Sequence, residues 1–314
     1  MTSTAESRSK SPTYSHLLYV RPGMQRSTSS SSVGSACSNN SNRSASSQSA
    51  ASTRGTSTLS LQGPRYADDH YPLINTIHPE TVPISVRRDH SVFWCARQMA
   101  QIHNIIIRAL NASWNYAAFV RAGTQQAADF LRYNQQLFTM LDHHQRFEND
   151  LLFPEIDSML CRPCAAENNN KKHDSFAERL AIFAKYVFGT KPAEFNGVTF
   201  QHIIESFAPD LVQHLHDKIP TLMGLHVLDS AALLKVWKKA SRRAAKQTGL
   251  YSSGPLTLGC QDKSFTIDGV KPDFPEMPWV LETVVRNWHS RRYAGAWDFC
   301  PSDLSGRRRQ MTTV

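Results

Sequence analysis

Apolar residues recur with the 3.6-residue period of an α-helix in four successive segments of this chain, between residues 89 and 226. In the first segment, for example, Met99, Ile106 and Leu110 fall on one face of the expected helix. The four helices are expected at about 89–120, 125–157, 171–188 and 199–225. Because each has one apolar face and the loops between them are short to medium in length, the pattern predicts an all-α fold, an up-down-up-down four-helix bundle.

The composition changes on either side of this bundle, which is expected over 89–226. The first 60 residues contain 20 serines and show no period, so residues 1–88 are expected to form a disordered Ser-rich tail and an extended lead-in. Residues 227–314 are expected to form a basic helix and an irregular extension rich in Trp and Arg, with a final helix near 278–293. The prediction is therefore one bundle domain with extra C-terminal helices.

The formal net charge of +9 is distributed unevenly along the chain. Residues 1–65 carry +6, residues 235–246 carry +6 and residues 286–314 carry +4, which leaves −7 for the remainder. Because the expected folded middle is acidic, specific nucleic-acid binding is not expected. No transmembrane segment is expected either, since no run approaches about 18 apolar residues. A cytoplasmic location is expected, although the Ser- and Arg-rich, acid-poor start also matches a mitochondrial transit sequence.

Each of the four expected helices places one histidine on its apolar face, namely His103, His144, His173 and His214. Glu148 lies four residues after His144 and therefore shares its face. Burying imidazoles and a carboxylate is costly unless they are paired, and a metal ion in the bundle core would pair them together. His143, His202 and His216 fall off the stripes, although His143 would replace His144 after a small rotation of its helix.

The same segments resemble those of a known family. They are His103 in the first helix, His144 with Glu148 and the following Leu152-Phe153-Pro154, His173-Asp-Ser-Phe176, and LVQHLHDKIPTL at 211–222. In this order, over about residues 89–226, they resemble the hemerythrin-like, or HHE cation-binding, family. The tail is similar to the C-terminal extension of fungal members, and the residues concerned are Trp288, Tyr293-Ala-Gly-Ala-Trp297 and Phe299-Cys-Pro301.

The resemblance implies a four-helix bundle around a non-haem di-iron centre with histidine and bridging carboxylate ligands. The family's ligands carry over to His103, His144, Glu148, His173 and His214. Where the family has a further histidine this chain has Asn169, and where it has a second carboxylate this chain has Lys218 and Ile219, with Asp217 beside them as a further candidate. One or two iron ions are therefore implied, and imidazole with carboxylate also suits manganese or zinc.

Two functions stay open at this point. The first is a metal-binding protein that binds or senses oxygen, nitric oxide or iron. The second is a metal-free bundle in which Lys218 pairs with Glu148, and which serves as a scaffold for a protein partner through the basic helix 235–246 and the C-terminal extension. An enzyme is not expected, because the sequence offers no nucleophile with an activating base.

Overall fold

The computed structural model describes residues 66–160, 165–247 and 253–311, with the side chains of residues 165–175 outside that description. All of these residues belong to one compact unit, Pro64–Val314. The Ser-rich tail expected over residues 1–65 lies outside the described residues.

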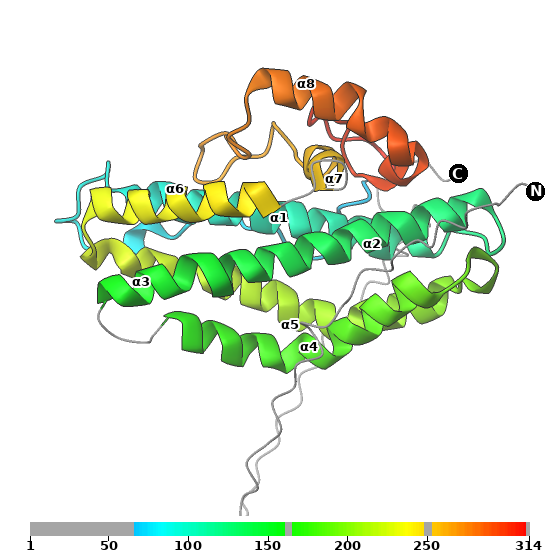
Figure 1. Ribbon diagram of the computed structural model, residues 1–314, viewed down its shortest axis with the longest axis horizontal. Coiled ribbons are helices and arrows are strands. Elements are labelled where there is room, and N and C mark those ends of the chain that lie inside the picture. The colour runs from blue at the N-terminus through cyan, green and yellow to red at the C-terminus, as the bar shows by residue number, and fades with distance from the viewer. Residues whose placement is uncertain (1–65, 161–164, 248–252, 312–314) are drawn as a thin grey trace, which may run out of the picture. The chain divides into compact units, whose positions relative to one another are not determined.

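The described part of the chain is all-helical, as predicted, and its only β pairing is three isolated bridges (Figure 1). The α-helices are α1 (Ser91–Ala117), α2 (Gln125–Arg146), α3 (Phe153–Leu160), α4 (Ala165–Gly189), α5 (Gly197–Met223), α6 (Ser230–Gln247), α7 (Ser253–Gly259) and α8 (Trp279–Asn287). Short 3-10 helices lie at Pro79–Thr81, Pro192–Glu194, Gly224–Val227 and His289–Phe299.

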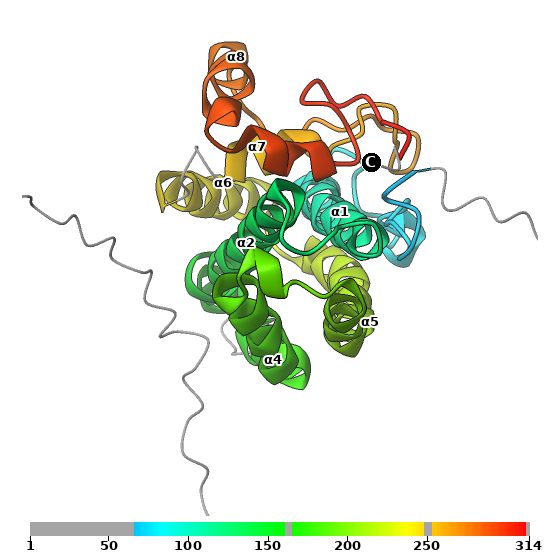
Figure 2. The ribbon, with the colours of Figure 1, turned by 90° about the vertical axis from the view of Figure 1, so that its right-hand side faces the viewer.

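The four long helices α1, α2, α4 and α5 enclose the main hydrophobic core. Helix α1 packs against α5 and α2, and α4 packs against the same two helices (Figure 2). Phe200 of α5 joins three of them, because its ring centroid lies 5.1 Å from that of Phe130 in α2 and 5.9 Å from that of Phe183 in α4. Each such buried phenyl ring contributes about 1.5–3 kcal/mol through the hydrophobic effect.

Local side-chain hydrogen bonds set where two of these helices begin. The Thr124 hydroxyl accepts the backbone N–H of Ala127 at the start of α2, and the Asn196 side chain accepts that of Thr199 at the start of α5. Gly197, the first residue of α5, permits a close approach to the end of α1, because a Cβ there would collide with the Ala117 carbonyl oxygen.

The helix expected over 125–157 is interrupted by a π-helical turn, Phe147–Leu152, between α2 and α3. Within this turn the backbone N–H of Phe153 donates to the carbonyl of Glu148, five residues earlier. The turn changes the helical phase of the residues that follow it, but the apolar residues on both sides still allow one uninterrupted helix to be read, so the sequence pattern does not reveal it. Single π turns inside helices are frequent at functional sites.

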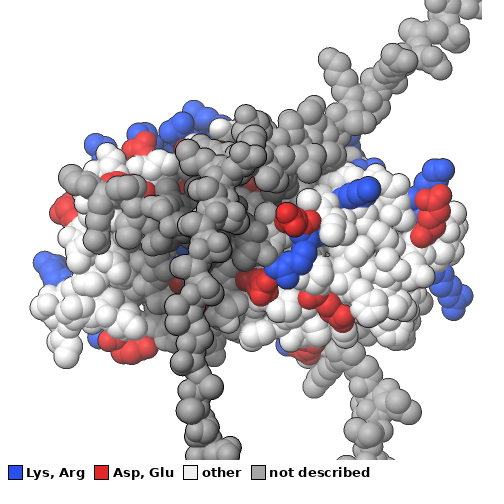
Figure 3. All heavy atoms as spheres, turned by 90° about the horizontal axis from the view of Figure 1, so that it is seen from below, with Lys and Arg blue, Asp and Glu red and all other residues white. Residues whose placement is uncertain are grey.

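Helices α6, α7 and α8 lie on the side of α1 and α2, away from α4 and α5 (Figures 1 and 2). Helix α6 is the expected basic helix, and it packs on α1 and α3 with Leu233, Trp237 and Ala240 buried. Its lysines and arginines lie outside that buried stripe, and no acidic residue occurs between Ser230 and Gln247. By contrast, cations and carboxylates are interspersed on the described surface visible in Figure 3. Among the described helices, none combines the length and apolar character that a membrane span requires.

The polar face of α1 holds the residues before α1 against the bundle. We give this name to the side chains of Gln98, Gln101, Asn104, Arg108, Asn111 and Asn115, all of which are buried. The Asn104 amide exchanges two hydrogen bonds with the backbone of Ile74, at 2.7 and 2.8 Å. The Asn111 amide accepts the backbone N–H of Tyr71 and donates to the carbonyl of Asp68. The lead-in to the first helix is therefore bound to α1 by side chain–backbone hydrogen bonds.

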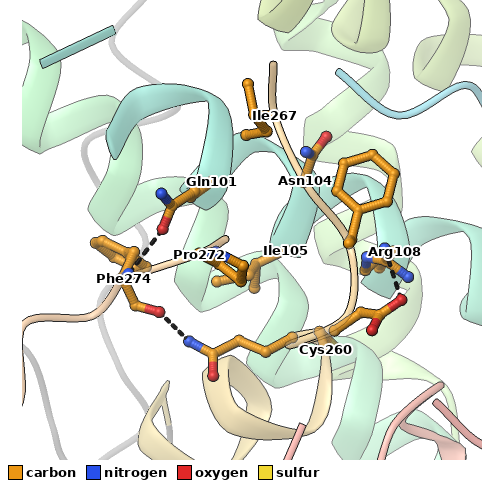
Figure 4. Close-up of a pocket in the computed structure, with 11 residues that line it drawn as sticks. Gln101, Asn104, Ile105, Arg108, Cys260, Ile267, Pro272 and Phe274 are labelled. Carbon is orange, nitrogen blue, oxygen red and sulfur yellow. Dashed lines mark hydrogen bonds and ion pairs between the residues drawn. The ribbon is translucent and has the colours of Figure 1, made fainter. Parts of the chain in front are cut away.

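The same face binds the C-terminal extension. The Gln101 amide oxygen accepts the backbone N–H of Phe274 at 2.7 Å, beside a small pocket between α1 and the extension (Figure 4). The Arg108 guanidinium pairs with the buried Asp68 carboxylate, which also accepts two hydrogen bonds from Arg308. Helix α1 is therefore covered on both sides, by the bundle and by the two ends of the described unit.

Candidate metal centre

Three side chains from three parts of the chain converge inside the bundle. His103 comes from α1, His144 from the last turn of α2, and Glu148 from the π turn that follows. The two Nε2 atoms lie 3.1 Å apart, and Glu148 Oε1 lies 3.6 Å from His144 Nε2 and 4.0 Å from His103 Nε2. The exposed fractions are 0 % for His103, 8 % for His144 and 1 % for Glu148. Among the described residues, these three form the one group able to hold a metal ion.

The neighbouring backbone orients one of the histidines. His103 Nδ1 lies 2.8 Å from the carbonyl oxygen of Leu215 in α5, and a carbonyl can only accept. The ring proton is therefore on Nδ1, and the lone pair of Nε2 points at the group. Backbone carbonyls fix the tautomer of metal-ligating histidines in this way.

The spacing of the three donor atoms fits a single metal ion. An ion about 2.1 Å from each donor keeps neighbouring donors about 3.0 to 3.4 Å apart, in octahedral or tetrahedral geometry respectively. The separations of 3.1, 3.6 and 4.0 Å reach these values after movements of less than about 1 Å. The residues present therefore fit one ion.

Burial keeps the imidazoles of the group in the form that binds metals. The pKa of His103 lies well below its usual range, because of burial first and then of the neighbouring His144 and Lys218. The pKa of His144 is also lowered by burial, against an opposing effect of the Glu148 carboxylate. Both rings are therefore neutral near pH 7. A metal ion binds neutral imidazole, so neither histidine has to be deprotonated from the imidazolium form first.

Lys218 of α5 reaches the same carboxylate from its other side. Its Nζ atom lies 3.5 Å from Glu148 Oε2 and 4.5 Å from the centroid of the Phe153 ring. With 6 % of its surface exposed, Lys218 faces the core. The pairing with Glu148 that the sequence left as an alternative is present in the structure.

Of the remaining predicted ligands, those whose side chains the structure describes lie outside this group. His214 is buried on α5, close enough to His103 to lower its pKa, with its ring 5.8 Å from that of Phe176. Asp217 is half-buried and accepts a hydrogen bond from Gln213 at 2.6 Å. His143 is also half-buried, and it follows Asp142 directly and precedes Arg146 by three residues in the sequence. The side chain of His173, on α4, lies outside the described residues, as does that of Asn169.

Comparison with known proteins identifies a relative. The chain is 35 % identical, over 246 residues, to the dimeric xanthone biosynthesis cluster protein R11 of Cryptosporiopsis sp. (strain 8999), and the match covers 78 % of this chain and 91 % of the relative. The chain belongs to the family of that protein. No protein-family model matches the chain, and no solved structure matches it.

Two neighbours of the group are not evident from the sequence. The Leu215 carbonyl is a backbone atom on another helix, and no side-chain pattern indicates it. Phe153 lies five residues after Glu148, which would place it off the Glu148 face in an α-helix. Because the intervening turn is π-helical, both residues contact Lys218. The five-residue spacing between Glu148 and Phe153 indicates a shared contact only if the π turn is already known.

Proposed function

We propose that this chain is a hemerythrin-like protein that binds one non-haem iron ion through His103, His144 and Glu148. The observation that carries the proposal is the convergence of two imidazole Nε2 atoms and one carboxylate oxygen within 4.0 Å of one another in the core. In the proposed arrangement, α1, α2, α4 and α5 form an up-down-up-down four-helix bundle around the centre.

The donor set supports iron. Two histidines and one carboxylate, with positions left open, are typical of non-haem ferrous sites, and the same donors also take manganese or zinc. A bound ferrous ion supplies open coordination positions and one-electron chemistry to the core. The residues of this chain orient the donors through the Leu215 carbonyl and exclude water by burial. Oxygen and nitric oxide remain the proposed gaseous partners.

The name of the relative points to a biosynthetic pathway. Protein R11 is named as part of a dimeric xanthone biosynthesis cluster. We therefore propose that this chain also serves a biosynthetic pathway, with the metal centre as its functional part.

A metal-free scaffold is the second candidate, and one observation favours it. Lys218 and Glu148 form an ion pair in the core, so the carboxylate has a cationic partner without any metal ion. In that case the basic helix α6 and the C-terminal extension would be the functional surfaces, with a protein as partner.

Metal titration of the full chain tests the proposal. The chain is stripped with a chelator, then titrated anaerobically with Fe(II) and with Co(II), whose visible spectrum reports its ligands. We expect one ion per chain in the wild type, a loss of binding of about 100-fold or more in Glu148→Gln and His144→Gln, and an unchanged affinity in the control His143→Gln. If the wild type binds neither ion, the metal function is wrong and the scaffold replaces it.

A further inference from the structure

The two oxygens of Glu148 face different partners. Oε1 points to the histidines, at 3.6 Å from His144 and 4.0 Å from His103, whereas Oε2 lies 3.5 Å from the ammonium of Lys218. The carboxylate thus lies between a position suited to a metal ion and a cation that belongs to the chain itself.

We infer that Lys218 acts as an internal cation that competes for Glu148, restricts the proposed centre to one metal ion, and makes the fold independent of that ion. This inference rests on the proposed metal function and deepens it. It assigns to Lys218 a positioning and selectivity role, without direct contact to a metal.

The limit to one ion follows from charge and distance. A second divalent ion bound through Oε2 would lie about 2.2 Å from that oxygen. The Lys218 ammonium already lies 3.5 Å from the same oxygen, so the two cations would be only a few ångströms apart in the core. Like charges at that separation repel strongly where water does not screen them.

The ammonium is held in this position. Phe153, 1 % exposed, presents its ring 4.5 Å from the Nζ atom, an arrangement that stabilises a cation electrostatically. Residue 218 itself is 6 % exposed, so its ammonium lies in the core beside Glu148 and not in solvent. The competition is therefore a fixed property of the site.

Independence of folding from metal follows from the same ion pair. A buried carboxylate without a cation is strongly destabilising. Lys218 supplies that cation in the core, so Glu148 is neutralised before any metal binds. Substituting Lys218 by a neutral residue would transfer this task to the metal ion, and stability would then depend on metal.

The test compares Lys218→Met with Lys218→Arg in the full chain, by Co(II) titration and by thermal melting with and without Co(II). We expect Lys218→Met to raise the Co(II) affinity by about tenfold or more, because one unit of like charge is removed from beside a divalent ion. Its melting temperature should fall without metal and recover with it. Lys218→Arg, which keeps the charge, should behave as the wild type in both measurements. Lys235→Met on the exposed side of α6 controls for the change in net charge.

The outcomes separate this inference from the proposed function. If the wild type binds one ion and Lys218→Met binds it with the same affinity, the inference is wrong and the metal function stands. Two ions in the wild type would overturn the inference in the same way. If the wild type and Lys218→Met both bind no Co(II), both proposals fail. Should Lys218→Met not fold even with Co(II), Lys218→Gln, which can still donate a hydrogen bond to Glu148, replaces it in the same two measurements.

Discussion

Helix α1 buries polar side chains on two opposite faces, and the faces differ in how their polar atoms are used. On the polar face, amide groups bond to the backbone of other segments, as Asn104 does with Ile74 and Gln101 with Phe274. Gln98 and Gln101 also donate to the carboxylate of Asp273, so each polar group there has its partner within the chain. On the opposite face His103 points at two other side chains, His144 and Glu148, with all three donor atoms near one point.

The polar face is a structural hydrogen-bond network, whereas the opposite face carries a candidate ligand site. Amide groups that exchange hydrogen bonds with peptide groups are satisfied within the chain, and they fix which segments pack together. The two imidazole nitrogens and the carboxylate oxygen, by contrast, converge on one point, as the ligands of a single metal ion do. Because polar side chains are buried on both faces, burial alone does not show which face carries the candidate site.

On the polar face, Arg108→Met should destabilise the fold strongly. This change leaves the buried carboxylates of Asp68 and Asp262 without one cation, so we expect the free energy of unfolding to fall by about 3–5 kcal/mol. Metal affinity should stay unchanged, because the site lies on the other face of α1. Urea denaturation and Co(II) titration measure the two quantities. If metal affinity fell as well, the two faces of α1 would be coupled, and the separation of structural and ligand-binding faces would be wrong.

A smaller loss is expected from Asn111→Ala. The change leaves the half-buried N–H of Tyr71 and the buried carbonyl of Asp68 without their side-chain partner, at a cost of about 1–3 kcal/mol. Limited proteolysis should then cleave within residues 66–78 faster than in the wild type, while Asn149→Ala, outside this face, serves as the control. Equal cleavage rates would mean that the lead-in is held by other contacts.

The site face is expected to respond to pH instead. His103 and His144 have pKa values lowered by burial, so they bind protons more readily in the unfolded chain. The two neutral imidazoles should therefore contribute fully to the free energy of unfolding above about pH 6.5, the pKa of a histidine in the unfolded chain. Below that pH the free energy of unfolding should fall, by at most about 1.4 kcal/mol per pH unit for each histidine. Unfolding at pH 7, 6 and 5 measures this. His103→Gln should have a shallower pH dependence, and an unchanged slope would mean that other groups control it.

The smallest effect is expected at His143, beside the site in sequence. His143→Gln should change the free energy of unfolding by less than about 0.5 kcal/mol, because the ring is half-buried and outside the converging group. The same substitution at His144 should remove metal binding. A loss of metal affinity in His143→Gln would indicate that the end of α2 is rotated relative to the structure.

The helical class of the fold could be predicted from sequence because apolar side chains repeat along α1, α2, α4 and α5 with the period of the helix. The covering of α1 could not. Its polar face repeats with the same period, which is typical of a solvent-exposed face, and the partners of Asn104 and Asn111 are backbone atoms 30 and 40 residues away. Hydrogen bonds to distant backbone leave no pattern in the sequence.

For the candidate site, the residues are readable but their grouping is not. Periodicity places His103, His144 and Glu148 on inward faces, and the structure brings these three together. The same periodicity places His214 inward, yet it lies outside the converging group, because periodicity gives the face on which a residue lies and not the position of its ring nitrogens. That Lys218 contacts both Glu148 and Phe153 depends on the π turn, which periodicity does not detect.

The pairing of Arg308 with Asp68 has a consequence for the order of synthesis. Asp68 leaves the ribosome early, and the arginine that completes its pairing is made 240 residues later. Until Arg308 is made, Asp68 lacks this partner, although the residues of the four long helices are already present. A premature stop that removes only the last few residues, including Arg308, would therefore weaken the attachment of the residues that precede α1, which lie far away in the sequence but next to Arg308 in the fold.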